Sequence, residues 1–299
     1  MALAEPGIRS LYTVQVPEHE RPNYRLSGDE INDHIGTLAA AAAQLSGLEK
    51  GPPSRFSVHE ISAYDECSNL VRTVECSVFS KKFGEESNGP EELTQEYEDY
   101  EANSTFFAVI DSHKLALLGA IRVARESARG FKTLVDINDS NIVKVPQGFT
   151  EDISPQAIYD REGINPHSTL DMMTLVSPEE FRYGPWSIGV QGSLYHEALE
   201  FTKRHEITHW LIMLDSRARQ GIHQIGIPFK PIMPPVEYLG SEETYPEWLV
   251  TSEIEPSMEK RNYELKAEIA AGIKKKALAR VNEGMLYGHN FKGNLQIVR

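Results

Sequence analysis

The sequence predicts an α/β fold with a mixed central β-sheet, and three observations support this prediction. Strand-like and helix-like segments alternate from residue 168 to residue 240, an order typical of parallel strands connected by helices. One of these strands, at 207–215, is apolar almost throughout, as expected for a strand that is buried on both faces. Earlier in the chain, strand-like runs at 104–111 and 115–125 are separated by the turn signal Asp111-Ser112-His113, which indicates an antiparallel hairpin.

The first part of the chain is expected to contain one helix ahead of the sheet. An alanine-rich segment begins near Ser27 or Asp29, either of which suits an N-cap, and it ends at Gly51-Pro52-Pro53. This Pro-Gly cluster is the predicted boundary between a helical extension at 1–54 and a main domain at 55–250.

Within the main domain the remaining elements follow from periodicity. Alternating residues at 55–62 predict a strand, and apolar residues at helical spacing predict a helix over 63–84. The acidic run at 84–101 contains Gly and Ser and is predicted to be a loop. After the hairpin we expect a strand at 168–177, a helix at 189–206, a strand at 207–215, a short helix at 216–226 and a final strand at 230–240.

Charge is distributed unevenly along the chain. The whole sequence carries a formal charge of −14, yet residues 256–299 contain nine basic and four acidic side chains. The tail at 251–299 is predicted to be helical and to dock on the main domain by one apolar face. The apolar residues of that face are Leu265, Ile269, Ile273 and Leu278. The lysine run at 274–276 suits either a solvated face or a site for an acidic partner, such as a carrier protein or a cofactor's phosphates.

Composition and charge exclude several classes of protein. Hydrophobic residues make up 40% and charged residues 25% of the chain, which is ordinary globular usage. Apolar runs are far shorter than the ~20 residues of a membrane-spanning helix, and no signal peptide is recognisable, so we expect a cytoplasmic protein. A pI near 5.2 argues against non-specific binding of nucleic acid. His205 and His209 lack accompanying ligands, and no metal site is expected.

Several motifs occur in an order that resembles a known family. The run EYEDYE at 96–101 precedes the hairpin, and the second strand of the hairpin carries Gly-x-x-Arg as Gly119 and Arg122. Phe79 lies toward the end of the preceding helix, and Asp171 lies on the predicted central strand. In these motifs and in the order of its elements the chain resembles the GNAT acyltransferase superfamily. Within it, the resemblance is to the acyl-homoserine-lactone synthases and the N-acyl amino acid synthases.

The resemblance covers residues 55–240 and implies a GNAT-like three-layer sandwich with helical N- and C-terminal extensions. It implies an N-acyltransferase that moves an acyl group from a thioester donor, an acyl carrier protein or acyl-CoA, to the amine of an amino acid or a biosynthetic intermediate. No permanently bound cofactor is implied. The chain departs from the family at Thr174, where the lactone synthases carry an arginine that helps to shape the S-adenosylmethionine site. Synthesis of a homoserine lactone is therefore not expected.

Two alternatives stay open beside this reading. A catalytically inert relative would bind an acylated carrier protein or a ligand in the same place without turnover. Another relative of the lactone synthases would use S-adenosylmethionine as a co-substrate in a different reaction. Neither a nucleic acid nor a membrane is expected as a partner, and a homodimer is neither required nor excluded.

The chemistry of acyl transfer to an amine identifies the candidate catalytic residues. The amine has to lose a proton, the carbonyl oxygen has to be stabilised as it gains charge, and the leaving thiolate has to be protonated. Glu98 and Glu101 are the candidate bases, and the resemblance adds Tyr195 as the residue that protonates the thiolate. The alternative for the acidic residues is a solvated loop with no part in catalysis.

The candidate substrate-binding residues are Glu96, Arg122, Asp171 and Phe79. Arg122 suits a bidentate contact with a substrate carboxylate, and it is equally able to pair with the acidic run. A carboxylate such as Asp171 among apolar neighbours needs a partner. Arg122 is the expected partner, either in a structural bridge or in a pair that faces the acceptor pocket. The candidates for binding the phosphates of the thioester donor, at the start of the next helix, are Gly189, Gly192 and Ser193.

The thioester site is expected between two neighbouring parallel strands that begin near Thr169 and Ile207. We expect these strands to diverge and to open a crevice for a pantetheine arm, with acidic side chains at its opposite mouth. Strand amides at this place are able to donate hydrogen bonds to the carbonyl oxygen.

Overall fold

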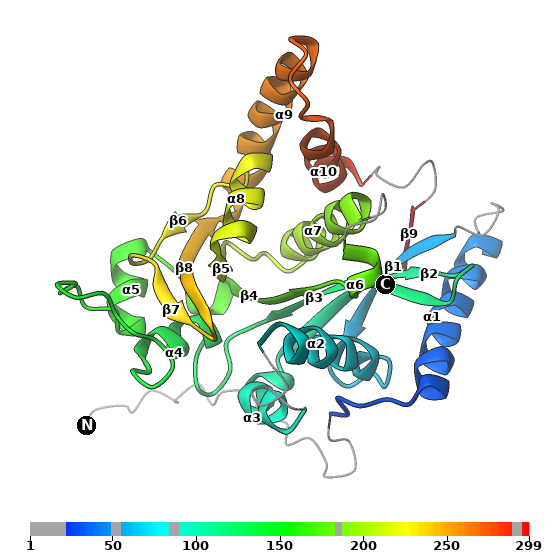
Figure 1. The fold of residues 1–299 in the computed structure, drawn as a ribbon, viewed down its shortest axis with the longest axis horizontal. Helices are drawn as coiled ribbons and strands as arrows, with labels where there is room; N and C mark the ends of the chain where they lie inside the picture. The colour runs from blue at the N-terminus through cyan, green and yellow to red at the C-terminus, as the bar shows by residue number, and fades with distance from the viewer. Residues whose placement is uncertain (1–21, 49–54, 84–89, 183–186, 289–294, 299) are drawn as a thin grey trace, which may run out of the picture.

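The computed structural model describes residues 22–48, 55–83, 90–182, 187–288 and 295–298. Its strands are β1 (Phe56–Ser62), β2 (Ser104–Asp111), β3 (Ala116–Ala124), β4 (Thr169–Val176), β5 (His209–Asp215), β6 (Lys230–Pro231), β7 (Val236–Tyr238), β8 (Ser241–Val250) and β9 (Leu295–Val298). They form one sheet in the order β6-β8-β5-β4-β3-β2-β1-β9, with β7 also paired to β8 (Figure 1). The pairs β4–β5 and β1–β9 are parallel and the others are antiparallel. The predicted α/β fold with a mixed central sheet is confirmed.

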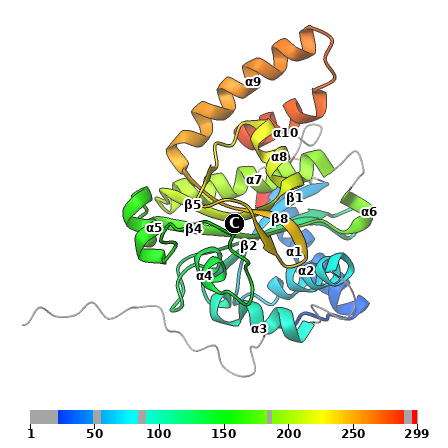
Figure 2. The ribbon, with the colours of Figure 1, turned by 60° about the vertical axis from the view of Figure 1, so that its left-hand side comes forward.

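Helices cover both faces of this sheet. They are α1 (Gly28–Leu48), α2 (Ser68–Phe83), α3 (Pro90–Glu101), α4 (Lys132–Asn138), α5 (Pro155–Glu162), α6 (Glu179–Arg182), α7 (Ser187–Arg204), α8 (Ser216–Ile225), α9 (Ile254–Ala270) and α10 (Lys276–Tyr287). Helices α1 to α4 lie on one face of the sheet, and α7 to α10 lie on the other (Figure 2). None of the described helices combines the length and apolar composition that crossing a membrane requires.

Alternation along the strands builds two cores, one on each face. On β2, Phe107 and Val109 are fully buried in the core that contains α7 to α10. Their neighbours Phe106 and Ala108 are equally buried in the core that contains α1 and α2. Because successive side chains of a strand point to opposite faces, an almost continuous apolar run serves both layers of helices. The result is the three-layer sandwich that was expected.

Gly119 on β3 lets α7 approach the sheet closely. A Cβ atom at this position would lie 2.7 Å from Cγ1 of Val190 on α7 and 3.2 Å from the carbonyl oxygen of Val176 on β4. Any side chain here would push the helix outward. The glycine of the Gly-x-x-Arg motif therefore has a packing role.

The acidic run at 84–101 is not a loop over the part that the structure describes. Residues 90–101 form helix α3, and 84–89 lie outside the described residues. Pro90 suits a first helical turn, and the following Glu, Leu and Gln residues are good helix formers. The prediction gave too much weight to the charge of the run and too little to its helix propensity.

The prediction of the last strands was also wrong. The segment 230–240 contains two short strands, β6 and β7, separated around Pro234-Pro235, and the long strand β8 that follows was missed. Strand β8 lies beside β5 and runs antiparallel to it over the whole length of β5. Within the described strands, β5 therefore has its parallel neighbour, β4, on one side only.

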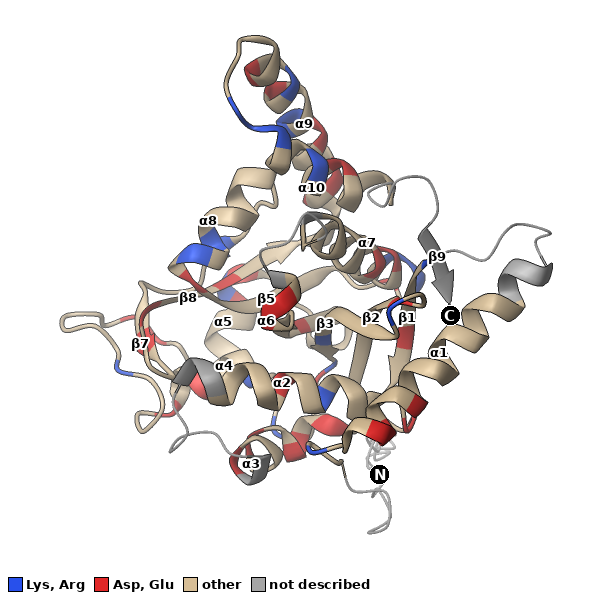
Figure 3. Ribbon diagram, turned by 45° about the vertical axis from the view of Figure 1, so that its right-hand side comes forward, with Lys and Arg blue, Asp and Glu red and all other residues tan. Residues whose placement is uncertain are grey.

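The C-terminal part forms two helices where one was expected. Helix α9 ends before Gly272, whose φ of +85° lies in the left-handed region that favours glycine, and α10 runs back beside α9. Ile273 was expected on the docked face but lies in this turn and is 50% exposed, whereas Leu265 is fully buried. The lysine run at 274–276 lies at the outer end of the helix pair (Figure 3). Helix α10 packs along α7, and β9 adds a strand beside β1, so both contribute to the main sheet and its helical layer.

Candidate functional site

Strands β4 and β5 separate part-way along their length. They pair at four positions, from Thr169 opposite His209 to Met172 opposite Ile212. Beyond these positions β4 continues to Val176 and β5 to Asp215 without pairing to each other. The predicted divergence of the two strands is therefore observed. Backbone groups that face across this gap have no ladder partner within the described strands.

A β-bulge marks the residue at which the strands part. On the side toward β3, Arg122 pairs with Thr174 and Val123 pairs with Met172, so Met173 is an extra residue on β4. A bulge bends its strand and increases the local twist. We attribute the separation of β4 from β5 to this bend, because it begins directly after Met172.

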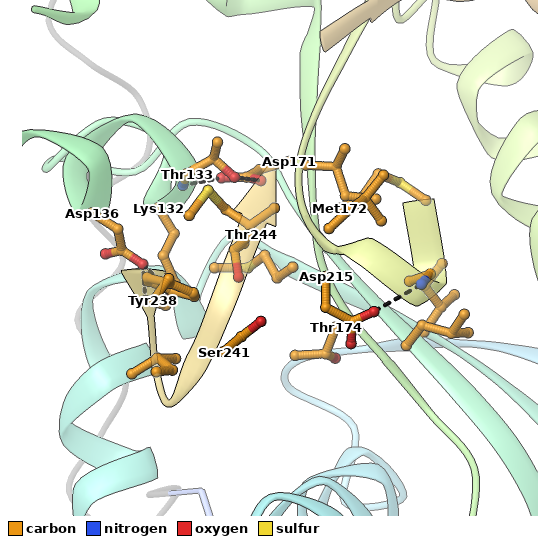
Figure 4. Close-up of a pocket in the computed structure, with 18 of the residues that line it drawn as sticks. Lys132, Thr133, Asp136, Asp171, Met172, Thr174, Asp215, Tyr238, Ser241 and Thr244 are labelled. Atoms are coloured by element: carbon orange, nitrogen blue, oxygen red, sulfur yellow. Dashed lines mark hydrogen bonds and ion pairs between the residues drawn. The ribbon is translucent and has the colours of Figure 1, made fainter. Parts of the chain in front are cut away.

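A cavity of about 220 Å³ lies at this separation and is lined from both faces of the sheet. Tyr195 of α7 and Ala218 of α8 line it on one side, and Phe79 of α2 and Thr133 of α4 line it on the other. The lining residues of β4, β5 and β8 lie around the gap (Figure 4). The gap thus gives both faces of the sheet access to one cavity.

One corner of the cavity is polar and charged. Lys132, at the start of α4, forms ion pairs with Asp136 at 2.5 Å and with Glu96 of α3 at 2.8 Å. The hydroxyl of Tyr238 donates a hydrogen bond of 2.6 Å to Asp136 (Figure 4). Burial by itself would lower the pKa of Lys132, but the carboxylates of Asp136 and Glu96 outweigh burial and raise it, so the ammonium stays charged. We call Glu96, Lys132, Asp136 and Tyr238 the polar corner.

Asp171 of β4 lies beside the polar corner, also at the cavity wall. Its carboxylate accepts hydrogen bonds from the backbone N–H of Thr133 at 2.8 Å and from the Thr133 hydroxyl at 2.7 Å. The residue at the N-cap position of α4, Phe131, has no capping side chain, so Asp171 satisfies this helix terminus from the neighbouring strand. Complete burial raises the pKa of Asp171 to about 6. The expected pair of Asp171 with Arg122 does not form.

Arg122 belongs to a different, buried group. Its guanidinium contacts Glu75 of α2 at 2.6 Å and Glu101 of α3 at 2.9 Å. Arg72 contacts the other oxygen of Glu101 at 2.7 Å, and the hydroxyl of Tyr24 donates to Glu101 as well. We call Arg72, Glu75, Glu101 and Arg122 the ion network; it holds two positive and two negative groups. Arg122 is therefore paired with the acidic run, one of the two arrangements that the sequence left open.

Glu101 is held in its charged form by the ion network. Burial acts to raise its pKa, but the guanidinium groups of Arg122 and Arg72 outweigh burial and lower the pKa to about 2. A carboxylate with this pKa and these partners is a poor proton acceptor at neutral pH. The geometry gives Glu101 a structural position, in which it fixes the end of α3.

The remaining candidates on the α3 side are separated by the helical twist. Glu96 and Phe79 line the cavity. Glu98, two residues along α3 from Glu96, is exposed and lies outside the cavity lining. Because residues two apart on a helix point in different directions, α3 offers Glu96 to the cavity and turns Glu98 to solvent.

Tyr195 of α7 reaches the cavity from the opposite face of the sheet. Its side chain is buried, and burial raises the pKa of the phenol, so the hydroxyl keeps its proton at neutral pH. The hydroxyl has no hydrogen-bond partner among the residues that the structure describes. It is therefore free to contact a molecule in the gap.

The three candidates at the start of α7 lie away from the cavity lining. Gly189 and Gly192 are buried, and the hydroxyl of Ser193 donates a hydrogen bond of 2.8 Å to the carbonyl oxygen of Gly189. Residues 183–186, which precede this helix, lie outside the described residues. A role of Gly189, Gly192 and Ser193 in binding phosphates stays a prediction.

Sequence reasoning missed Lys132, Thr133, Asp136 and Tyr238. The first three lie in the segment 131–138, for which the sequence analysis predicts no element although Lys132 and Asp136 have the spacing of a helical ion pair. Tyr238 lies in a strand, as predicted, but it is 102 residues from Asp136 in the sequence, and no local pattern indicates their contact. Among the described residues, no group of three or more metal-ligating side chains is arranged around a common point.

Neither a protein-family model nor a curated protein matches the sequence. Among solved structures, the chain is similar to FeeM, an N-acyl amino acid synthase from uncultured soil microbes, with 13% identity and a TM-score of 0.49 over 70% of this chain and 98% of that one. It is similar to BjaI, a CoA-dependent acyl-homoserine lactone synthase, with 13% identity and a TM-score of 0.45 over 76% and 99%. A putative N-acetyltransferase from Lactobacillus plantarum gives 11% identity and a TM-score of 0.42 over 66% and 99%. These solved structures are of the kinds of protein that the sequence resembles.

Proposed function

We propose that this protein is an N-acyltransferase that moves an acyl group from a pantetheinyl thioester to an amine. The observation that carries the proposal is the gap between β4 and β5, which gives both faces of the sheet access to one cavity. Acyl transfer brings together two dissimilar substrates, and a site that is open to both faces of the sheet lets each substrate enter from its own side. The gap offers such a point, with a phenol on one side and carboxylates on the other.

The pantetheine arm would lie in the gap from the side of α7 and α8. It is an extended chain with amide groups, and the backbone of β4 from Met173 and of β5 from Met213 offers unpaired strand edges to such a chain. The exposed side chain of Ala218 on α8 marks the cavity mouth on this side. Both acyl-CoA and an acylated carrier protein supply this arm, and the proposal includes either.

The acyl group would enter the apolar part of the cavity. Phe79 of α2, Leu93 of α3 and Met173 of β4 line this part, on the face of the sheet opposite to α7. These side chains offer burial to an alkyl chain and no hydrogen bond. The amine would lie in the polar corner, near Asp171.

The residues at the cavity then divide the proton transfers between them. Asp171, with its pKa raised to about 6, accepts a proton from the amine, directly or through a water molecule. The amine nitrogen forms a bond to the carbonyl carbon, and freed strand amides stabilise the oxyanion. The carbon–sulfur bond then breaks, and Tyr195 donates its proton to the leaving thiolate. The second proton leaves the nitrogen for the phenolate of Tyr195, directly or through a water molecule, so that the phenol is restored. The products are an amide and a free thiol.

Release of free thiol tests this proposal directly. The protein is incubated with acyl-CoA or an acylated carrier protein and a panel of amines and amino acids, and the thiol is measured with a chromogenic disulfide. We expect amine-dependent thiol release, reduced by Asp171→Asn and Tyr195→Phe. Stable binding of a thioester without thiol release for any acceptor would instead identify an inert binder.

Two further measurements separate the remaining alternatives. Ala218→Trp should block the cavity mouth and abolish thioester binding, whereas Ala267→Trp, on the exposed surface of α9, should leave it unchanged. Thermal unfolding in the presence of S-adenosylmethionine tests use of that compound. A shift of the unfolding temperature that Glu96→Gln removes would favour a reaction that consumes it.

A further inference from the structure

Acidic side chains outnumber basic ones among the described residues that line the cavity. Among the described lining residues the one cation is Lys132, and the carboxylates are Glu96, Asp136, Asp171 and Asp215. Asp215 is engaged at the other side of the gap, where it caps α8 by accepting from the N–H of Ala218 at 2.7 Å. The part of the cavity assigned to the acceptor thus contains three carboxylates and one ammonium group.

Lys132 has no hydrogen-bond donor left for a ligand. An ammonium group has three N–H donors. Its partners are Asp136 at 2.5 Å, Glu96 at 2.8 Å and the hydroxyl of Tyr238 at 3.5 Å. A substrate carboxylate could reach Lys132 only by displacing one of these groups into a buried position without a partner, which is costly.

The arginines that form ion pairs with α3 are also engaged. Arg122 and Arg72 are buried in the ion network. Arg129 forms an ion pair of 2.8 Å with Asp99 on the exposed side of α3, and it does not line the cavity. No basic side chain in the described lining is therefore placed to bind a carboxylate on the acceptor.

Glu96, in contrast, is placed to bind an ammonium group. Its Oε1 contacts Lys132, while its side chain keeps 20% exposure at the cavity wall. A cation beside Glu96 would also interact favourably with Asp136 and Asp171. The same arrangement would repel an anionic group.

We infer that the acceptor is a cationic amine without a carboxylate. This inference rests on the proposed acyl transfer and specifies the class of its acceptor. A monoamine or diamine fits this site, and a free amino acid does not. This inference narrows the two acceptor classes that the sequence left open, because an α-amino acid would bring its carboxylate into the polar corner together with its amine.

Calorimetric binding to pairs of compounds that differ only in the carboxylate tests the inference without requiring turnover. The pairs are phenethylamine with phenylalanine, and 1,4-diaminobutane with ornithine. We expect the decarboxylated member of at least one pair to bind at least tenfold more tightly, equivalent to about 1.4 kcal/mol. Equal or tighter binding of the amino acid in both pairs, or binding of none of the four compounds, would overturn it.

Substitutions assign the preference to the polar corner. Glu96→Gln removes one negative charge and should reduce the tenfold preference by several-fold. Glu259→Gln makes the same change on the exposed surface of α9 and should leave the preference intact. The same preference in both variants would contradict the inference. Absence of thiol release with every amine would count against the proposed function, whereas the binding preference would still decide the acceptor class.

Discussion

Arg122 on β3 and Glu101 at the end of α3 form a buried ion pair, with 2.9 Å between Nη1 and Oε1. The two residues stand 21 positions apart, and sequence motifs assigned one to substrate binding and the other to catalysis. In the folded chain the guanidinium of Arg122 and the carboxylate of Glu101 are partners of each other. Together with Glu75 and Arg72 they connect α2, α3 and β3, and so position the helix that carries Glu96 to the cavity.

Breaking the ion network should destabilise the protein severely. Arg122→Met leaves Glu75 and Glu101 buried without their shared partner, and removal of one member of a buried ion pair costs about 3–5 kcal/mol. Urea unfolding should show this loss. Arg129→Met is the matched control, because its ion pair with Asp99 is exposed and should contribute less than about 1 kcal/mol. Similar losses in the two variants would show that the ion network is not a structural element.

The closeness of α7 to the sheet should depend on Gly119. In Gly119→Ala the new Cβ would meet Val190 at 2.7 Å and the backbone of Val176 at 3.2 Å, and overpacking of this kind costs about 1–3 kcal/mol. Gly221→Ala is the control, since its Cβ would point into open space on α8. That change should raise the free energy of unfolding by about 0.4–1 kcal/mol. An unchanged stability of Gly119→Ala would refute the close approach of α7.

Turnover should follow the ionisation of Asp171. A base with a pKa of about 6 is ionised above that pH, so kcat/KM should rise with pH through about 6 and then level off. Asp171→Asn should remove this inflection and lower kcat by about 10²–10⁴-fold. Initial rates of both proteins, measured at a series of pH values from about 5 to about 8, give the inflection of kcat/KM and the loss of kcat. An inflection that survives in Asp171→Asn would assign the base to another group.

The titration of Asp171 should also change the free energy of unfolding, which should fall with rising pH whereas kcat/KM rises. Because burial raises the pKa of Asp171 from 3.8 to about 6, the folded state binds more protons than the unfolded state between these values. The free energy of unfolding should therefore fall as pH rises from about 4 to about 6. Asp171→Asn should reduce that slope, as measured by urea unfolding at a series of pH values. A wild-type slope unaffected by the substitution would place the titration elsewhere.

His59 on β1 should make the protein sensitive to acid. Its ring lies 2.7 Å from the Ser57 hydroxyl, and burial lowers its pKa from 6.5 to about 4. Its contribution to stability is present above pH 6.5 and should be lost as pH falls toward about 4. The stability difference between wild type and His59→Gln should accordingly shrink over this range. His113→Gln, at an exposed position, is the matched control; a constant difference for His59→Gln would contradict the assignment.

Much of the fold was predictable from local patterns. The apolar run at 207–215, the hairpin turn at Asp111 and the helical spacing over 189–206 each depend on neighbouring residues, and each predicts an element that the structure contains. Strand β8 and helix α3 were missed because Pro246 and the acidic residues of 90–101 obscure their patterns. The division of the chain at residues 54 and 250 stays a prediction.

The sequence by itself determined the order of the central elements, the two-sided core and the types of residue available for acyl transfer, because periodicity and composition are local properties. Only the tertiary structure decided which charges meet. It placed Glu101 with Arg122 and Asp171 with Thr133, and it brought Tyr238 to Asp136, since partners of buried charges are set by the packing of distant elements. It also placed Glu96 at the cavity and turned Glu98 to solvent. The two residues are only two positions apart, and the direction in which each points depends on how helix α3 is oriented, which an acidic run in the sequence does not reveal.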